Sequence, residues 1–135
     1  MADQTDKKPI VEIMADQTHK GAIVKKPWGH ELIWARTERY VGKILHINKE
    51  EALSRQYHNV KDETVRVLNG RMTMELGPDG SQNKVLMEPG DSLHIMPGMI
   101  HRMIAVDDCD VLEVSTPELE DVVRLDDRYG RVENK

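Results

Sequence analysis

Two short segments of the chain contain side chains of the types that bind a divalent metal ion. The first holds Gln56 and His58 and is followed by Glu63, and the second ends in His101. Residues two apart on a β-strand point to the same face, so Gln56 and His58 point together. Two imidazole nitrogens, a carboxylate and an amide oxygen suit a divalent transition metal. The residue types therefore indicate a mixed nitrogen and oxygen site, provided that the fold joins the two segments.

A plainer interpretation of these histidines stays open at this point. The chain has six histidines, so some of them will pair by chance. A single histidine in a β-rich protein is more often a surface residue or a hydrogen-bonded core residue than a metal ligand. Spacing alone therefore leaves both interpretations standing.

Composition limits the classes of protein and partner. The chain has 135 residues, which fits one domain, and a net charge of -5 with a pI near 5.7. An acidic balance argues against a nucleic-acid partner or an anionic membrane. No apolar run approaches the roughly 18 residues of a membrane span. The N-terminus lacks the apolar core of a signal peptide, so we expect a cytoplasmic protein.

The single cysteine, Cys109, excludes an intrachain disulfide and a cysteine-based zinc finger. Three acidic neighbours would raise the pKa of its thiol, which argues against a nucleophilic role. The chain has no Phe but eight Met residues, so we expect methionine and aliphatic side chains to fill the core.

The first 26 residues differ from the rest of the chain. Residues 1–5 (MADQT) recur as residues 14–18, which indicates a short tandem duplication or a second possible start at Met14. The repeat is too short to build a solenoid. We therefore expect residues 1–22 to form a mobile or partner-dependent arm without chemistry, and residues 23–135 to form one β-barrel domain.

The pattern of that domain is β-rich, with apolar segments about ten residues apart and Gly and Pro between them, which is typical of a closed barrel or sandwich. Asn69-Gly70 predicts a tight turn. Only the tail, residues 117–128, could be briefly helical. The expected strands cover residues 40–47, 63–68, 72–76, 84–87, 92–96, 102–106 and 110–114.

Two of these segments resemble the two motifs of the cupin superfamily. Residues 53–70 resemble the first motif in its Gln-x-His-x4-Glu-x6-Gly form, and residues 90–102 resemble the second. Residues 26–29 (KPWG) and 127–131 (DRYGR) make the match more specific. Together they are similar to the cupin domain of type II mannose-6-phosphate isomerases, often fused behind a mannose-1-phosphate guanylyltransferase. The resemblance implies an all-β, single-domain cupin, a double-stranded β-helix or jelly-roll barrel with a short C-terminal tail.

The resemblance also implies a metal. Phosphomannose isomerases typically hold zinc by Gln, His, Glu and His, which here fall on Gln56, His58, Glu63 and His101. We expect one divalent ion, zinc first, with manganese, iron, cobalt or nickel as alternatives. Many cupins have His where Gln56 stands. An amide oxygen suits a Lewis-acid metal better than an oxygen-activating iron site.

The implied activity is a metal-dependent isomerisation of a sugar phosphate, interconverting mannose 6-phosphate and fructose 6-phosphate through a metal-stabilised enediolate. A general base must take the proton from carbon. Metal-bound water, His94 and Glu31 are the candidates. His94 and Ser92 are two residues apart on an expected strand and so point to the same face, and either face of that strand could line a cavity. For Glu31, the alternative is a solvated carboxylate at a strand edge.

A phosphorylated sugar also requires cations. We expect Lys43, Arg102 and Arg128 to bind the phosphate, since guanidinium groups bind phosphate bidentately. Lys43 lies in an apolar strand, where a charge must face solvent or a polar cavity. Arg102 follows His101 directly, so the two would face opposite sides of a strand. Surface ion pairs with the acidic tail are the alternative for each cation.

Two other functions stay open. One is a non-catalytic cupin module that binds a metal or a sugar. The other is an iron-dependent cupin oxygenase, against which Gln56 argues. Small cupins commonly dimerise through a sheet face or an N-terminal strand, so we expect a homodimer.

Overall fold

The computed structural model describes residues 18–78, 80 and 83–132, so most of the expected arm over residues 1–22 lies outside the described residues. Strands are the regular elements of this part of the chain, and the described residues include no helix. None of them therefore forms a helix long and apolar enough to cross a membrane. The all-β class expected from the sequence is confirmed.

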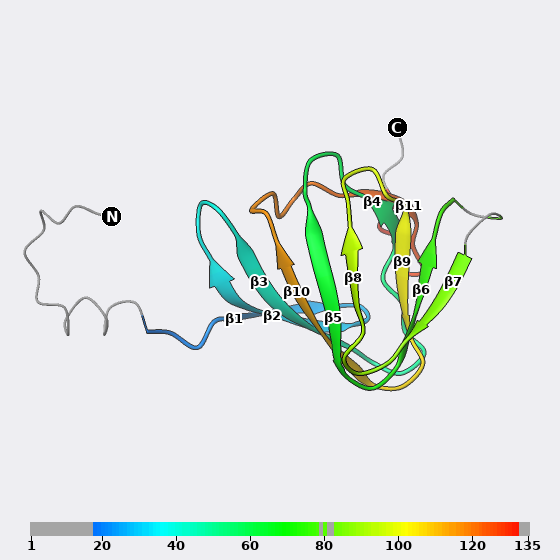
Figure 1. The fold of residues 1–135 in the computed structure, drawn as a ribbon, viewed down its shortest axis with the longest axis horizontal. Helices are drawn as coiled ribbons and strands as arrows, with labels where there is room; N and C mark the ends of the chain where they lie inside the picture. The colour runs from blue at the N-terminus through cyan, green and yellow to red at the C-terminus, as the bar shows by residue number, and fades with distance from the viewer. Residues whose placement is uncertain (1–17, 79, 81–82, 133–135) are drawn as a thin grey trace, which may run out of the picture.

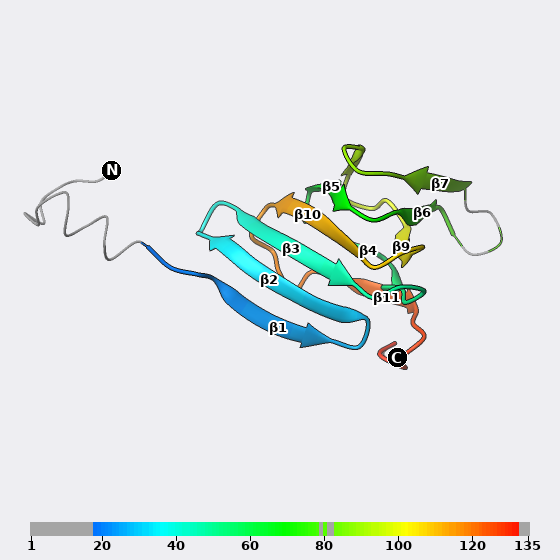
Figure 2. The ribbon, with the colours of Figure 1, turned by 90° about the horizontal axis from the view of Figure 1, so that it is seen from below.

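The described residues form eleven strands in two antiparallel sheets, and Figures 1 and 2 show how these strands are arranged. The six-stranded sheet contains, in spatial order, β1 (Ala22–Lys26), β2 (Gly29–Arg36), β3 (Val41–Ile47), β10 (Cys109–Ser115), β5 (Glu63–Asn69) and β8 (Ser92–Ile95). The five-stranded sheet contains β11 (Val123–Asp126), β4 (Arg55–Tyr57), β9 (His101–Ala105), β6 (Met72–Leu76) and β7 (Asn83–Met87). This arrangement is the jelly-roll barrel expected from the sequence.

The tail is where the expected secondary structure is wrong. The possible short helix over residues 117–128 does not form, and residues 123–126 are instead strand β11, which pairs with β4. Arg124 lies opposite Gln56 in that pairing. The edge of β4 offers backbone N–H and C=O groups that need partners, and the backbone of the tail supplies them. Pairing with this distant strand therefore overrides the weak helical tendency of the tail.

The turn predicted at Asn69-Gly70 forms, with a φ of 73° at Gly70. A Cβ atom at Gly70 would lie 2.2 Å from the carbonyl oxygen of Asp108, so both the conformation and the close approach require glycine. The turn does not make a hairpin, however. It leads from β5 in one sheet to β6 in the other, and so joins the two layers.

The core lies between the two sheets and contains the methionines expected in place of aromatic rings. Met72, Met74, Met87 and Met103 are all buried in it, together with aliphatic residues and Trp28. Flexible methionine side chains fill the irregular space between two sheets that present few large rings.

The inward-facing residues change from polar to apolar along several strands. On β5, Glu63 precedes Val65 on the same inward face, and on β9, His101 precedes Met103. On β10 the inward Glu113 is buried as well. The interior is therefore divided into an apolar part and a polar part, and the polar part holds the candidate site.

Candidate metal centre

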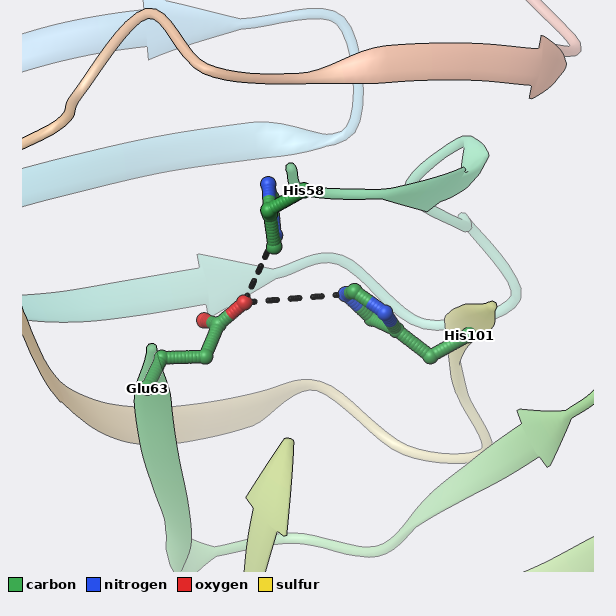
Figure 3. Close-up of side chains that lie close together, drawn as sticks. All are labelled: His58, Glu63 and His101. Atoms are coloured by element: carbon green, nitrogen blue, oxygen red, sulfur yellow. Dashed lines mark ion pairs between the residues drawn. The ribbon is translucent and has the colours of Figure 1, made fainter. Parts of the chain in front are cut away.

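Three buried side chains from three separate strands or strand ends converge in the polar part of the interior. His58 follows β4 directly, Glu63 begins β5, and His101 begins β9. Glu63 Oε2 lies 2.7 Å from Nε2 of His58 and 3.7 Å from Nε2 of His101. Each side chain offers one ligand atom, and these atoms all lie within 4.8 Å of one another. Figure 3 shows both rings directed at the carboxylate.

Backbone carbonyl groups fix the orientation of both imidazole rings. Nδ1 of His58 lies 2.6 Å from the carbonyl oxygen of Asp121, and Nδ1 of His101 lies 2.9 Å from that of Met99. A carbonyl oxygen only accepts hydrogen bonds, so each Nδ1 carries the proton. In the neutral ring Nε2 then keeps its lone pair, which is the arrangement of a metal-bound histidine.

The atoms facing the centre lack hydrogen-bond partners. His58 Nε2, Glu63 Oε2 and His101 Nε2 are buried, and none forms a hydrogen bond of acceptable geometry within the described part of the chain. Buried polar atoms are rarely left unsatisfied. Two imidazole nitrogens and a carboxylate oxygen match the ligand set of a divalent transition metal. These residues therefore fit the metal expected from the sequence.

The electrostatics of Glu63 and His101 favour the forms that bind a cation. Burial raises the pKa of Glu63, but His58, Lys61 and His101 outweigh it and lower this pKa to about 2. Glu63 is therefore an ionised carboxylate at neutral pH. Burial lowers the pKa of His101 more than the neighbouring Glu63 raises it, which favours the neutral ring.

Gln56 lies on β4 opposite His101 on β9 and lines the same pocket as His58 and Glu63. Its Oε1 accepts a hydrogen bond of 2.7 Å from Oγ of Ser54. The amide is thus held at the site, and its role as a fourth ligand stays a prediction.

A residue that the sequence reasoning missed holds the loop between the first two ligands. The carboxylate of Asp121 accepts hydrogen bonds from the backbone N–H groups of Asn59, Val60 and Lys61 at 3.0, 2.7 and 2.8 Å. These bonds lower the pKa of Asp121 to about 2. Nothing in the sequence singles out this acid from the others in the tail.

The site opens into a pocket of about 590 Å³, counting its open mouth. Its wall includes Gln56, His58 and Glu63, and many of its other residues are charged. The charged residues other than Glu63 are Lys26, Glu31, Lys43, Lys61, Glu113, Arg124 and Arg131.

Two residues predicted from the sequence meet in this pocket. Nζ of Lys43 lies 3.1 Å from Oε1 of Glu31, and both side chains are largely buried. Lys26 lies farther from the same carboxylate, at 4.0 Å. The charge in the apolar strand β3 thus faces the polar cavity, the second of the two environments considered for Lys43.

The structure does not bring His94 to the pocket. Its side chain is 55% exposed, and its Nε2 lies 2.6 Å from Oδ1 of Asp62. On β8 the inward positions belong to Leu93 and Ile95, which pack towards the core, so His94 and Ser92 face outward. Of the two faces left open by strand parity, His94 is on the outer one.

Arg102 and Arg128 also lie outside the wall of this pocket. Arg102 is buried with its Nε donating to the carbonyl of Leu53 and its Nη1 donating to Asp126. It points away from His101 because adjacent residues on a strand face opposite sides. Nη1 of Arg128 donates to the carbonyl of Glu50 at 2.6 Å. Both cations thus have structural partners.

A buried ion pair beside the metal ligands was not predicted. Nζ of Lys61 lies 3.0 Å from Oε2 of Glu113 and 3.9 Å from Oε1 of Glu63. Burial lowers the pKa of Lys61, but these two carboxylates together raise it by more, so the ammonium group stays charged. Burial also raises the pKa of Glu113. A charged residue at an inward position of β10, in line with Val111, was the signal that could have revealed Glu113.

Comparison with known sequences gives a family and two relatives. The cupin domain family model matches residues 43–115. Mannose-1-phosphate guanylyltransferase of Escherichia coli K12 is 33% identical over 139 residues, which cover 97% of this chain and 28% of that protein. Mannose-1-phosphate guanylyltransferase ManC of Salmonella typhimurium matches with the same figures. The chain thus spans less than a third of the length of these relatives.

Solved structures share the fold at low sequence identity. KdgF from Halomonas sp. has a TM-score of 0.63 and 20% identity, with 74% of this chain and 91% of that chain covered. The capsular polysaccharide assembling protein CapF from Staphylococcus aureus has a TM-score of 0.67 and 14% identity, with 84% and 34% covered. At this identity the likeness concerns the fold.

Proposed function

This chain belongs to the cupin domain family, and from that premise we propose that it is a metal-dependent sugar-phosphate isomerase that interconverts mannose 6-phosphate and fructose 6-phosphate. The observation that carries the proposal is the content of one pocket. His58 and Glu63 of the buried His58–Glu63–His101 cluster line it, beside the largely buried carboxylate of Glu31 and a surplus of cations. Each is a component that the reaction requires.

The charge of the pocket supports an anionic substrate. Five cationic side chains line it against three carboxylates, whereas the whole chain carries a net charge of -5. A locally positive, partly enclosed surface attracts a phosphate ester more strongly than an exposed one, because the surrounding dielectric is lower. The cations are Lys26, Lys43, Lys61, Arg124 and Arg131, and the carboxylates are Glu31, Glu63 and Glu113.

The metal would be held by His58, Glu63 and His101, with Gln56 as a fourth ligand, and zinc is the ion we propose first. When bound, such an ion supplies electrophilic stabilisation of negative charge that develops on substrate oxygens. The backbone hydrogen bonds to both Nδ1 atoms keep the rings oriented without a rearrangement of the ligands.

We assign the proton transfer to Glu31. Its carboxylate takes the proton from C2 of the open-chain aldose, and the resulting acid returns a proton to C1. The hydroxyl proton of O2 passes to O1 in the same conversion, so the reaction has no net gain or loss of protons. Lys43, at 3.1 Å, holds the carboxylate towards the pocket. His94 is an unsuitable base because it faces outward.

The curated relatives add support for the sugar. Both are named for a reaction of mannose 1-phosphate, and 97% of this chain aligns with each of them. The aligned part is 28% of their length, so their guanylyltransferase activity is no part of this proposal.

The test is a direct assay joined to metal analysis. The purified chain, loaded with zinc or manganese, is incubated with mannose 6-phosphate in deuterated water, and the products are followed by NMR. We expect fructose 6-phosphate to form, and Glu63→Gln, as a folded control, to lose both metal and activity. A metal-loaded chain that binds the sugar phosphate but forms no product would contradict the proposal and favour a binding module. Oxygen consumption with iron would instead favour an oxygenase.

A further inference from the structure

Arg124 stands out among the cations of the pocket because no described residue holds its guanidinium. Its Nε is buried, and this atom has no hydrogen-bond partner among residues 18–78, 80 and 83–132. Lys43 is held by Glu31, Lys61 by Glu113 and Arg131 by Asp127. A partly buried cation without an internal counterion is costly unless a ligand supplies one.

The position of Arg124 ties it to the candidate metal centre. Arg124 on β11 lies directly opposite Gln56 on β4. Side chains directly opposite each other in an antiparallel pair share one face of the sheet, with Cβ atoms about 4.5–5.5 Å apart. Both residues line the same pocket. Arg124 therefore extends from a backbone position beside a predicted metal ligand and lines the same pocket as that ligand.

Two further cations lie where this pocket adjoins a second one. The second cavity has a volume of about 910 Å³, counting its open mouth, and it shares Lys26, Arg124 and Arg131 with the first. Lys26 ends β1 and Arg131 follows β11, so the three cations come from both ends of the described chain. Among the residues that the structure describes, Glu120 is the one carboxylate that lines the second cavity.

The three cations differ in how much charge they can offer. Asp127 holds Arg131 through two bonds, from Nε at 2.8 Å and from Nη2 at 2.9 Å, which orients the guanidinium and offsets its charge. Lys26 has only a distant contact with Glu31, at 4.0 Å. Arg124 thus offers the planar, uncompensated donor set that binds a phosphate bidentately.

We propose that Arg124 is the main contact for the phosphate group of a phosphorylated sugar, with Lys26 and Arg131 at its flanks. The inference deepens the proposed function and rests on it for the identity of the sugar. It moves the phosphate site from Arg102 and Arg128 to the strand that closes the edge of β4. The phosphate then lies at the Arg124 side of the pocket, and the reacting carbons lie towards Glu31 and the metal ligands.

The experiment measures binding of mannose 6-phosphate, unphosphorylated mannose and inorganic phosphate to the zinc-loaded chain by titration calorimetry. Arg124→Gln keeps a polar end group that can donate hydrogen bonds but removes the charge. We expect it to bind mannose 6-phosphate about tenfold to a hundredfold more weakly, since charge-assisted hydrogen bonds are among the stronger ones. Arg124→Lys should restore part of this loss. Arg128→Gln, outside the pocket, should bind like the unchanged chain.

The outcomes separate this inference from the proposed isomerase activity. If the unchanged chain binds mannose 6-phosphate without converting it, and Arg124→Gln abolishes the binding, the phosphate site stands and the isomerase proposal fails. If Arg124→Gln and Arg124→Lys bind and convert the sugar phosphate as the unchanged chain does, the phosphate site is wrong. Absence of binding to the unchanged chain also overturns it. Loss of affinity for inorganic phosphate alone, with mannose 6-phosphate unaffected, would assign Arg124 to a free-anion site and reject the sugar-phosphate site.

Discussion

The backbone carbonyl oxygen of Asp121 lies 2.6 Å from Nδ1 of His58, which joins the C-terminal tail to the first histidine of the candidate metal centre. The carboxylate of the same residue accepts hydrogen bonds from the backbone N–H groups of the three residues that follow His58, namely Asn59, Val60 and Lys61. One tail residue thus orients a ligand ring and fixes the loop leading to Glu63. The tail is part of the site rather than an appendage to the barrel.

Substitution of that acid should weaken metal binding without unfolding the chain. Asp121→Ala removes three backbone hydrogen bonds and a long side-chain one from the loop but leaves the backbone carbonyl. We expect the zinc affinity to fall about tenfold or more, as is typical when the groups supporting a ligand are removed. Competition with a chelator measures the affinity. Asp107→Ala, which disrupts only an exposed pair with Arg71, is the matched control and should bind zinc normally.

Metal binding should stabilise the fold through the three buried ligand atoms. A metal that binds only the native state raises its stability, by about 2.7 kcal/mol at a free concentration a hundred times the dissociation constant. We therefore expect zinc to raise the melting temperature and EDTA to reverse the rise. Glu63→Gln should lose this response. A melting temperature that zinc leaves unchanged in the chain with its native residues would count against the site.

The choice of base gives a third prediction. Glu31→Gln should lower kcat by about 10²- to 10⁴-fold, the usual contribution of a general base, while leaving zinc content unchanged. His94→Gln is the control, because His94 is exposed and faces outward. Steady-state assays with mannose 6-phosphate measure both. A large loss in His94→Gln, with Glu31→Gln active, would reverse the assignment.

The buried thiol should make stability depend on alkaline pH. Burial and the carboxylates of Asp110, Asp107 and Asp108 raise the pKa of Cys109 to about 12. The unfolded thiol loses its proton near pH 8.5, so between that pH and 12 the native state binds more protons than the unfolded state. This difference makes stability fall as pH rises above about 8.5. Urea unfolding at pH 7 and pH 10 should show the loss.

The control for this effect is Cys109→Ala, whose stability should fall less between the two pH values. The native thiol should also resist iodoacetamide at pH 8 and react only after unfolding, since the thiolate is the reactive form. Rapid alkylation of the folded chain would contradict both expectations.

Local patterns were enough to predict much of this protein. Alternation of apolar and polar residues located most of the strands to within one or two residues, because a strand has a side-chain period of two that can be read directly. His58 and Glu63 could likewise be expected to lie close together in the folded chain, because few residues separate them in the sequence. The homodimer and the role of residues 1–22 stay predictions.

Other features depended on which segments meet in space. Strand parity showed that Ser92 and His94 share a face, but only the packing of Leu93 into the core decided that this face is the outer one. The strand in the tail needed the free edge of β4, and Arg124 gained its place opposite Gln56 through that pairing.

The sequence by itself determined the fold class and the types of ligand, because both follow from short-range periodicity and spacing. Only the tertiary structure decided which charges share the pocket. Lys61 meets Glu113, and Asp121 meets His58, across about fifty or more positions of the chain. Such contacts arise when two sheets close around a common interior, and no local pattern encodes which of many similar acids and bases will be enclosed.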